Sequence, residues 1–183
     1  MGYQASYFNT TGANNATLGF SAGKNNTTGQ HNTSIGQSAG RATNSGSYNV
    51  AVGSDALRTN TTASNNTAVG YQALLDNVTG TSLVAVGYRA LANNTANSNT
   101  AVGLSALFTN TTGSENTGLG TGALYANTTG ASNSAVGYGS LDSNTTGSNN
   151  TALGRDALTA NTTASQRAMQ RIIQRRMEDM GEE

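Results

Sequence analysis

The stretch NTAVGYQAL at residues 66–74 decides the fold, because close variants of it return along almost the whole chain. Its glycine, Gly70, belongs to a series with a spacing of 17 residues, interrupted by one spacing of 16 between Gly87 and Gly103. Ten phased copies exclude chance, and a fixed period of this kind indicates a stacked repeat architecture. The repeated glycines are Gly2, Gly19, Gly36, Gly53, Gly70, Gly87, Gly103, Gly120, Gly137 and Gly154.

One unit is too short for two helices and a turn, and its Thr-Ala-Val-Gly segment alternates as a short strand does. Each unit is therefore expected to form one turn of a solenoid, with one or two short strands and polar corners. We predict an all-β fold, a parallel β-solenoid of the β-roll type with ten coils, over residues 1–164. Coils stacked about 4.8 Å apart would make a rod about 48 Å long.

Two apolar columns are assigned to the core. The residue before each repeated glycine is aliphatic, and the residue four places after it is leucine from the fourth copy onward. The first three copies carry Ser6, Gly23 and Gly40 at that second position, so the N-terminal coils are predicted to be thinner and less stable. The predicted core residues are Val52, Val69, Val86, Val102, Leu119 and Val136 in the first column and Leu57, Leu74, Leu91, Leu107 and Leu124 in the second.

A column of small residues lies two places before the repeated glycine. Adjacent strand residues point to opposite faces, so this column is expected to face away from the core. An outer column that stays small would allow another backbone to approach closely, and we predict that it forms the interface of a homo-oligomer. Its members are Ala51, Ala68, Ala85, Ala101, Gly118, Ala135 and Ala152.

Two columns of asparagine run through the repeats, one beginning at Asn15 and the other at Asn9. Stacked amides can hydrogen-bond from one coil to the next, as in cross-β ladders. Asparagine also tolerates the left-handed conformation of tight corners, and the repeated glycine is expected to serve a corner with positive φ.

The repeat ends after Ser165, and the residues that follow have the spacing of one apolar helical face. Thr163 and Gln166 match a capping box, so residues 165–183 are predicted to contain an amphipathic helix. Such a short helix is marginal alone, which leaves a trimeric coiled coil, a neck or an anchor docked on another protein as its expected roles. Its apolar residues include Met169, Ile172, Ile173, Met177 and Met180.

Composition excludes several classes of function. The chain has no cysteine and one histidine, His31, which excludes a disulfide framework and a multi-histidine metal site within one chain, and we expect no cofactor. A net charge of zero predicts no nucleic-acid partner. No apolar run approaches the roughly 20 residues of a membrane span, and no secretory signal is visible at the first residues.

The repeated unit resembles the head repeats of trimeric autotransporter adhesins of the YadA type, and related repeats of phage fibres. The resemblance covers residues 1–164, although the unit here is longer than that of the adhesin heads. It implies a left-handed roll, three rolls around one axis, and a neck where the C-terminal helix is expected. No ligand-binding residue of the family has an identifiable counterpart in this chain.

The resemblance implies a non-enzymatic structural and adhesive fibre. With no secretory signal or barrel anchor in view, we expect a trimeric fibre on the surface of a virion, held at one end by another virion or surface protein. Its free surface would contact a host glycan or protein. A head fragment of a bacterial surface adhesin is the alternative.

The residues also bear on two further functions, ice binding and catalysis. Threonine pairs such as Thr27-Thr28 and Thr128-Thr129 recur in register and could order water for ice binding, although Asn-Thr-Thr-Gly is also ordinary turn chemistry. A glycosidase needs two carboxylates no more than about 9.5 Å apart. Asp55 and Asp156 lie six coils apart, about 29 Å at the same rise, and Asp76, Glu115 and Asp142 are scattered, so we predict that the chain is not an enzyme.

Overall fold

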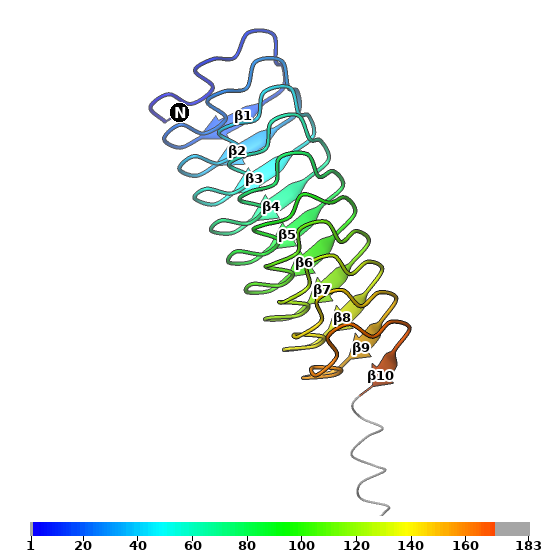
Figure 1. Ribbon diagram of the computed structural model, residues 1–183. Helices are drawn as coiled ribbons and strands as arrows, with labels where there is room; N and C mark the ends of the chain where they lie inside the picture. The colour runs from blue at the N-terminus through cyan, green and yellow to red at the C-terminus, as the bar shows by residue number, and fades with distance from the viewer. Residues whose placement is uncertain (1, 171–183) are drawn as a thin grey trace, which may run out of the picture.

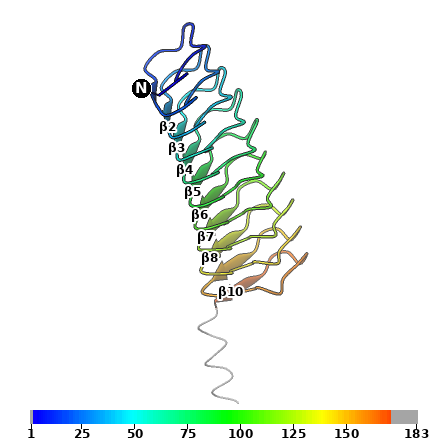
Figure 2. The same cartoon turned by 90° about the vertical axis from the view of Figure 1, so that its left-hand side faces the viewer.

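The computed structural model describes residues 2–170 and has the form of an elongated rod of stacked coils (Figure 1). Each coil contributes one strand of three residues, and the strands lie one after another along one side of the rod (Figures 1 and 2). The strands are β1 (Ala16–Leu18), β2 (Thr33–Ile35), β3 (Val50–Val52), β4 (Thr67–Val69), β5 (Val84–Val86), β6 (Thr100–Val102), β7 (Thr117–Leu119), β8 (Ser134–Val136), β9 (Thr151–Leu153) and β10 (Ala168–Gln170).

All ten strands form one parallel sheet in chain order, and equivalent residues of successive units stand beside each other. Ala68, for example, pairs with Ala51 on one side and with Ala85 on the other. The described residues contain no helix. The prediction of an all-β parallel solenoid is therefore confirmed.

The repeated glycine marks a place where two coils approach each other too closely for a side chain. Gly70 has φ of 130°, a conformation that side chains disfavour, and a Cβ placed on it would lie 2.5 Å from the carbonyl oxygen of Gly87. The other repeated glycines from Gly19 to Gly154 also have positive φ. The corner role expected for this glycine is confirmed.

Three further positions of each coil reach the left-handed region, and none of them is one of the two asparagine columns. Gln72, Leu74 and Asn65 represent these positions, with φ of 55°, 52° and 62°. The asparagine that follows Asn65, Asn66, belongs to a column and has no positive φ. The expectation that the column asparagines occupy left-handed corners is wrong, and hydrogen bonding explains why they recur.

Both asparagine columns bind neighbouring coils. In the column of Asn66, the Nδ2 of Asn66 donates to the carbonyl of Gly80 at 2.9 Å, and its Oδ1 accepts the backbone N–H of Leu83 at 3.1 Å. In the second column the amides bond to each other, with Asn127 Nδ2 donating to Asn110 Oδ1 at 2.7 Å. The predicted coil-to-coil amide ladder is confirmed, and it runs without a break from Asn94 to Asn161.

The core lies between the inward residues of the strands and a leucine column on the opposite wall. The predicted core leucines Leu57, Leu74, Leu91, Leu107 and Leu124 are fully buried. The small column Ala51, Ala68, Ala85, Ala101, Gly118, Ala135 and Ala152 also points into the coil and is inaccessible to solvent. The aliphatic column Val52, Val69, Val86, Val102, Leu119 and Val136 points outward and is partly or largely exposed.

The two strand columns were therefore assigned to the wrong faces. The alternation of a strand defines two faces but does not say which one is internal. Here the leucine crosses the narrow interior, so that a Cβ on Gly118 would lie 3.4 Å from Cδ1 of Leu107. Only a small residue fits beneath that side chain, and the larger valine is excluded from the lumen.

The single spacing of 16 residues is absorbed in a polar corner. Asn94 Nδ2 donates to the carbonyl of Ala96, two residues on, whereas Asn77 and Asn110 bond to the carbonyl three residues on. Strands β5 and β6 on either side keep their register. One residue is thus lost from the corner without disturbing the sheet.

The solenoid continues past its predicted end. Ala168 to Gln170 form β10, and the backbone of Met169 is paired with Ala152. Gln166 has φ of 59°, as Asn149 and Asn65 do at the equivalent position, so the expected helix is wrong for residues 166–170. The remaining helix residues Ile172, Ile173, Met177 and Met180 lie outside the described part of the chain.

Candidate interaction surfaces

The outer surface of the sheet is the first candidate. We call it the sheet face and define it by the side chains of the first and third residues of strands β1 to β9. No charged residue occurs among them, and the third residue is always Val, Leu or Ile. Leu18, Val102 and Leu153 are 55%, 39% and 45% exposed. A continuous apolar stripe therefore runs along the rod in contact with solvent.

The residues predicted to form an oligomer interface do not contribute to this surface. Ala68 and its equivalents lie inside the coil with at most 1% exposure for the alanines, so another chain cannot touch them. The outward residues that sequence analysis placed in the core occupy the sheet face instead. The repeat pattern identified both columns, but the direction of each depended on the volume available inside the coil.

Threonine hydroxyls also stand on the sheet face. Thr67, Thr100 and Thr117 are first residues of their strands, and no partner is found for their hydroxyls within residues 2–170. Each is separated by one inward residue from an aliphatic side chain. The sheet face thus presents hydroxyl and methyl groups at regular intervals.

The threonine pairs of the corners play a different role. The first hydroxyl of the pair donates to a backbone carbonyl of the next coil, as Thr111 does to Thr128 and Thr128 does to Thr145, both at 3.0 Å. These hydroxyls close the corner rather than face a ligand. The turn-chemistry alternative for the pairs is the one that the geometry favours.

The second candidate surface follows the repeated glycines. We call it the turn face and define it by the positions one, two and five residues after each of them. Stacked rings occur there, with centroids 5.5 Å apart for Tyr71 and Tyr88 and 5.4 Å apart for Phe108 and Tyr125. The guanidinium of Arg89 lies 4.5 Å from the Phe108 ring centroid. Aromatic rings of successive coils therefore form ladders on the outside of the rod.

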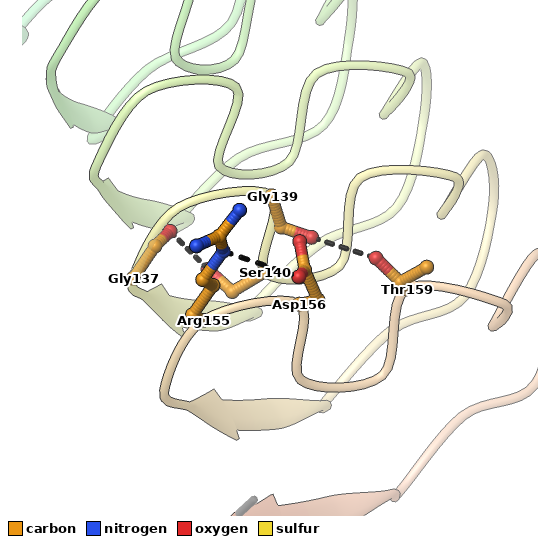
Figure 3. Close-up of polar contacts among 6 residues, drawn as sticks. All are labelled: Gly137, Gly139, Ser140, Arg155, Asp156 and Thr159. Atoms are coloured by element: carbon orange, nitrogen blue, oxygen red, sulfur yellow. Dashed lines mark hydrogen bonds and ion pairs between the residues drawn. The ribbon is translucent and has the colours of Figure 1, made fainter.

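Two carboxylates of adjacent coils influence each other at the C-terminal end of the turn face. Burial, and after it the charge of Asp156, raises the pKa of the Asp142 carboxyl above its ordinary value. Asp156 pairs with Arg155 at 3.4 Å and lies next to the backbone of Gly139, where Thr159 also donates to the carbonyl at 2.9 Å (Figure 3). The hydroxyl of Ser140 donates a hydrogen bond to the carbonyl of Gly137, in the same turn, at 3.0 Å.

Asp142 was predicted to be scattered from the other carboxylates on a different coil. It does lie on a different coil from Asp156, but close enough for their charges to interact. The signal was present in the repeat, because positions two and five residues after the glycine share one face in adjacent coils. Among the described residues no group of three or more His, Cys, Asp or Glu could hold a metal ion. The ring of His31 stacks on Tyr48 at a centroid distance of 5.0 Å.

Residues 2–170 contain no helix that is long and apolar enough to cross a membrane. No family model, no curated protein and no solved structure matches the chain.

Proposed function

We propose that this chain is a non-enzymatic, structural and adhesive fibre protein that assembles as a homotrimer through its sheet face. The observation that carries the proposal is the uncharged, exposed aliphatic column of strands β1 to β9. An extended apolar stripe of this kind favours burial against another apolar surface. The number of three chains comes from the resemblance to adhesin heads and phage fibres.

A second copy of this chain is the partner that best fits the sheet face, because the two packed surfaces then have the same period. Each coil adds one aliphatic residue to the sheet face, at a rise of about 4.8 Å. A parallel neighbour repeats these residues at the same rise, so that every coil meets an equivalent coil. A globular partner has no reason to match such a spacing over the length of the rod.

The setting that we propose for the fibre is the surface of a virion, with one end attached to another protein of the particle and the sides free to contact a host surface. A fragment of a bacterial surface adhesin is the alternative setting. In either one, the rigid rod serves to hold binding residues away from the point of attachment.

Sedimentation equilibrium on the full chain tests the assembly. The wild-type protein should have three times the chain mass of 18.5 kDa. The triple variant Val69→Lys, Val86→Lys, Val102→Lys should be monomeric and still folded by circular dichroism. The matched variant Thr79→Lys, Thr112→Lys, Thr129→Lys, at exposed corners, should remain trimeric. A folded wild-type monomer would refute the trimer.

Ice binding is the second candidate, and the sheet face is again the observation that favours it. A flat array of hydroxyl and methyl groups, free of charge and repeated without offset, is suited to a crystalline surface. If the wild-type chain is a folded monomer, inhibition of ice recrystallisation should be measured next. Its loss in the valine-to-lysine variant would establish that function, and an inactive wild type would exclude it.

A further inference from the structure

The basic residues of the first half of the rod share one column of the turn face. Lys24, Arg41 and Arg58 each stand five residues after a repeated glycine, in three successive coils. The backbone N–H of Asn25 donates to the Arg41 carbonyl, and that of Ala42 to the Arg58 carbonyl, both at 3.0 Å. The three residues therefore stack at about 4.8 Å per coil. We call them the basic ladder.

The ladder gives the rod a polarity that the net charge of zero conceals. Residues 2–69 contain three basic residues and one acidic residue, a net charge of +2. Residues 70–170 contain three basic and four acidic residues, a net charge of −1. The acidic residue within residues 2–69, Asp55, pairs with Arg58 at 3.6 Å. Lys24 and Arg41 have no ion pair among the described residues.

The fold does not require cations at this position. In the later coils the same column holds Leu75, Ala92, Phe108 and Tyr125. Like charges on adjacent rungs repel each other and lower the stability of the coils. A ligand of opposite charge that spans the rungs would remove this repulsion, which makes the ladder a candidate binding surface.

Exposed aromatic rings adjoin the ladder. Tyr7 occupies the same column one coil before Lys24 and is 65% exposed. The ammonium group of Lys24 lies 5.9 Å from the Phe8 ring centroid. Tyr3 and Phe20 stack beside them with centroids 5.6 Å apart. Such rings offer flat apolar surfaces with polar edges, which suit the C–H faces of sugar rings.

We propose that the basic ladder binds a linear acidic polysaccharide that lies along the rod. Its carboxylate or sulfate groups pair with Lys24, Arg41 and Arg58, and its sugar rings pack against Tyr7 and Phe8. One sugar unit of an extended chain is comparable in length with one coil, so that successive units meet successive cations. Three cations are few for nucleic acid, whose binding depends on many phosphate contacts. The inference deepens the adhesive function proposed above and rests on it for its biological setting.

The test is a titration of the full-length protein with heparin, which carries sulfates, and with polygalacturonate, which carries carboxylates. The ladder variant Lys24→Gln, Arg41→Gln, Arg58→Gln should bind the preferred polymer at least tenfold more weakly than the wild type. The control Arg89→Gln, Arg155→Gln, Arg167→Gln removes the same charge from the second half and should change the affinity by less than twofold. Binding should weaken with added salt, because the pairing charges are partly or fully accessible to solvent.

Equal losses in the two variants, unchanged binding by the ladder variant, or equal binding of neutral dextran would overturn the proposal. Duplex DNA that binds as tightly as the acidic polymers would identify the ladder as a general polyanion surface and would also overturn it. Sedimentation of the same samples separates this result from the assembly. A monomer that binds through the ladder would refute the trimer alone, and a trimer that binds neither polymer would refute the ladder alone.

Discussion

The early coils (residues 2–49) and the late coils (residues 50–153) have the same backbone conformation, but different side chains fill their interiors. In the late coils a buried leucine lies against an inward alanine or glycine of the strand. In the early coils the leucine is replaced by Ser6, Gly23 and Gly40, and the inward strand residues are the larger Thr17 and Ser34. A Cβ on Gly23 would lie 2.8 Å from Cγ2 of Thr17, so volume has moved from one wall to the other.

This difference shows that the shape of a coil and its stability have separate origins. The shape follows from the repeated glycine, the left-handed corners and the backbone bonds between coils, which both regions have. The stability depends on apolar volume, and in the early coils hydroxyl groups take the place of leucine methyl groups. Ser6 Oγ and Thr17 Oγ1 bond to each other at 3.0 Å, which satisfies both groups but buries little apolar surface.

The largest expected effect comes from breaking the late coils. Leu107→Ala should lower the free energy of unfolding by about 3 kcal/mol, because it opens a cavity at a fully buried position. Ser6→Ala, at the equivalent position of the first coil, should cost less than about 1 kcal/mol, the value of one exchanged hydrogen bond. Chemical denaturation followed by circular dichroism measures both. Equal losses would show that the leucine column does not distinguish the two regions.

The second-largest change in stability is expected when an early coil is given the interior side chains of a late coil. Gly23→Leu alone should destabilise the chain, since Thr17 occupies the space, although leucine accepts the backbone there: Leu57 and Leu74 both have φ of 52°. Gly23→Leu combined with Thr17→Ala should stabilise it by about 2 kcal/mol through burial of one leucine. Amide hydrogen exchange at Ala22 should slow in the double variant. If the single and double variants have the same free energy of unfolding, the side chains of the two walls do not compete for the same space.

A smaller gain is expected from repair of the amide ladder. Thr43 interrupts the column, and Asn26 Oδ1 is buried without a hydrogen-bond partner in the described part of the chain. Thr43→Asn should supply a donor and raise the free energy of unfolding by about 1 kcal/mol. Thr43→Asp has a similar size but no amide donor, and it should be destabilising. Thermal unfolding of both variants decides the matter, and a stabilising aspartate would exclude the ladder as the cause.

The smallest effect concerns the late coils and depends on pH. Burial and the charge of Asp156 raise the pKa of Asp142 in the folded chain above the ordinary value of 3.8. The free energy of unfolding should therefore fall as the pH rises from that value through the raised pKa. Asp142→Asn should be more stable than the wild type at neutral pH, and the difference should vanish in acid. A difference that is independent of pH would exclude ionisation as its origin.

Sequence analysis predicted the period, the parallel sheet, the leucine core and the amide ladder, because each leaves a mark at a fixed position of every unit. Its prediction of the internal strand face was wrong, since Ala68 and Val69 alternate equally well in either direction. That choice depended on the reach of Leu74 and its equivalents across the lumen. The helical spacing after Ser165 was also misleading for residues 166–170, because pairing with β9 outweighs a local apolar pattern. The closeness of Asp142 and Asp156 needed the coil geometry.

Equivalent residues of successive coils pair with each other, so the chain can change in length by whole coils. Every coil bonds only to the coil before and the coil after it, and Ala68 meets alanine on both sides. Recombination between two repeats of the gene would add or remove whole coils and keep the same backbone register at each new junction. The reach of the rod can therefore vary in steps of one coil, while the loss of a single residue between Asn94 and Ala96 is absorbed in a corner.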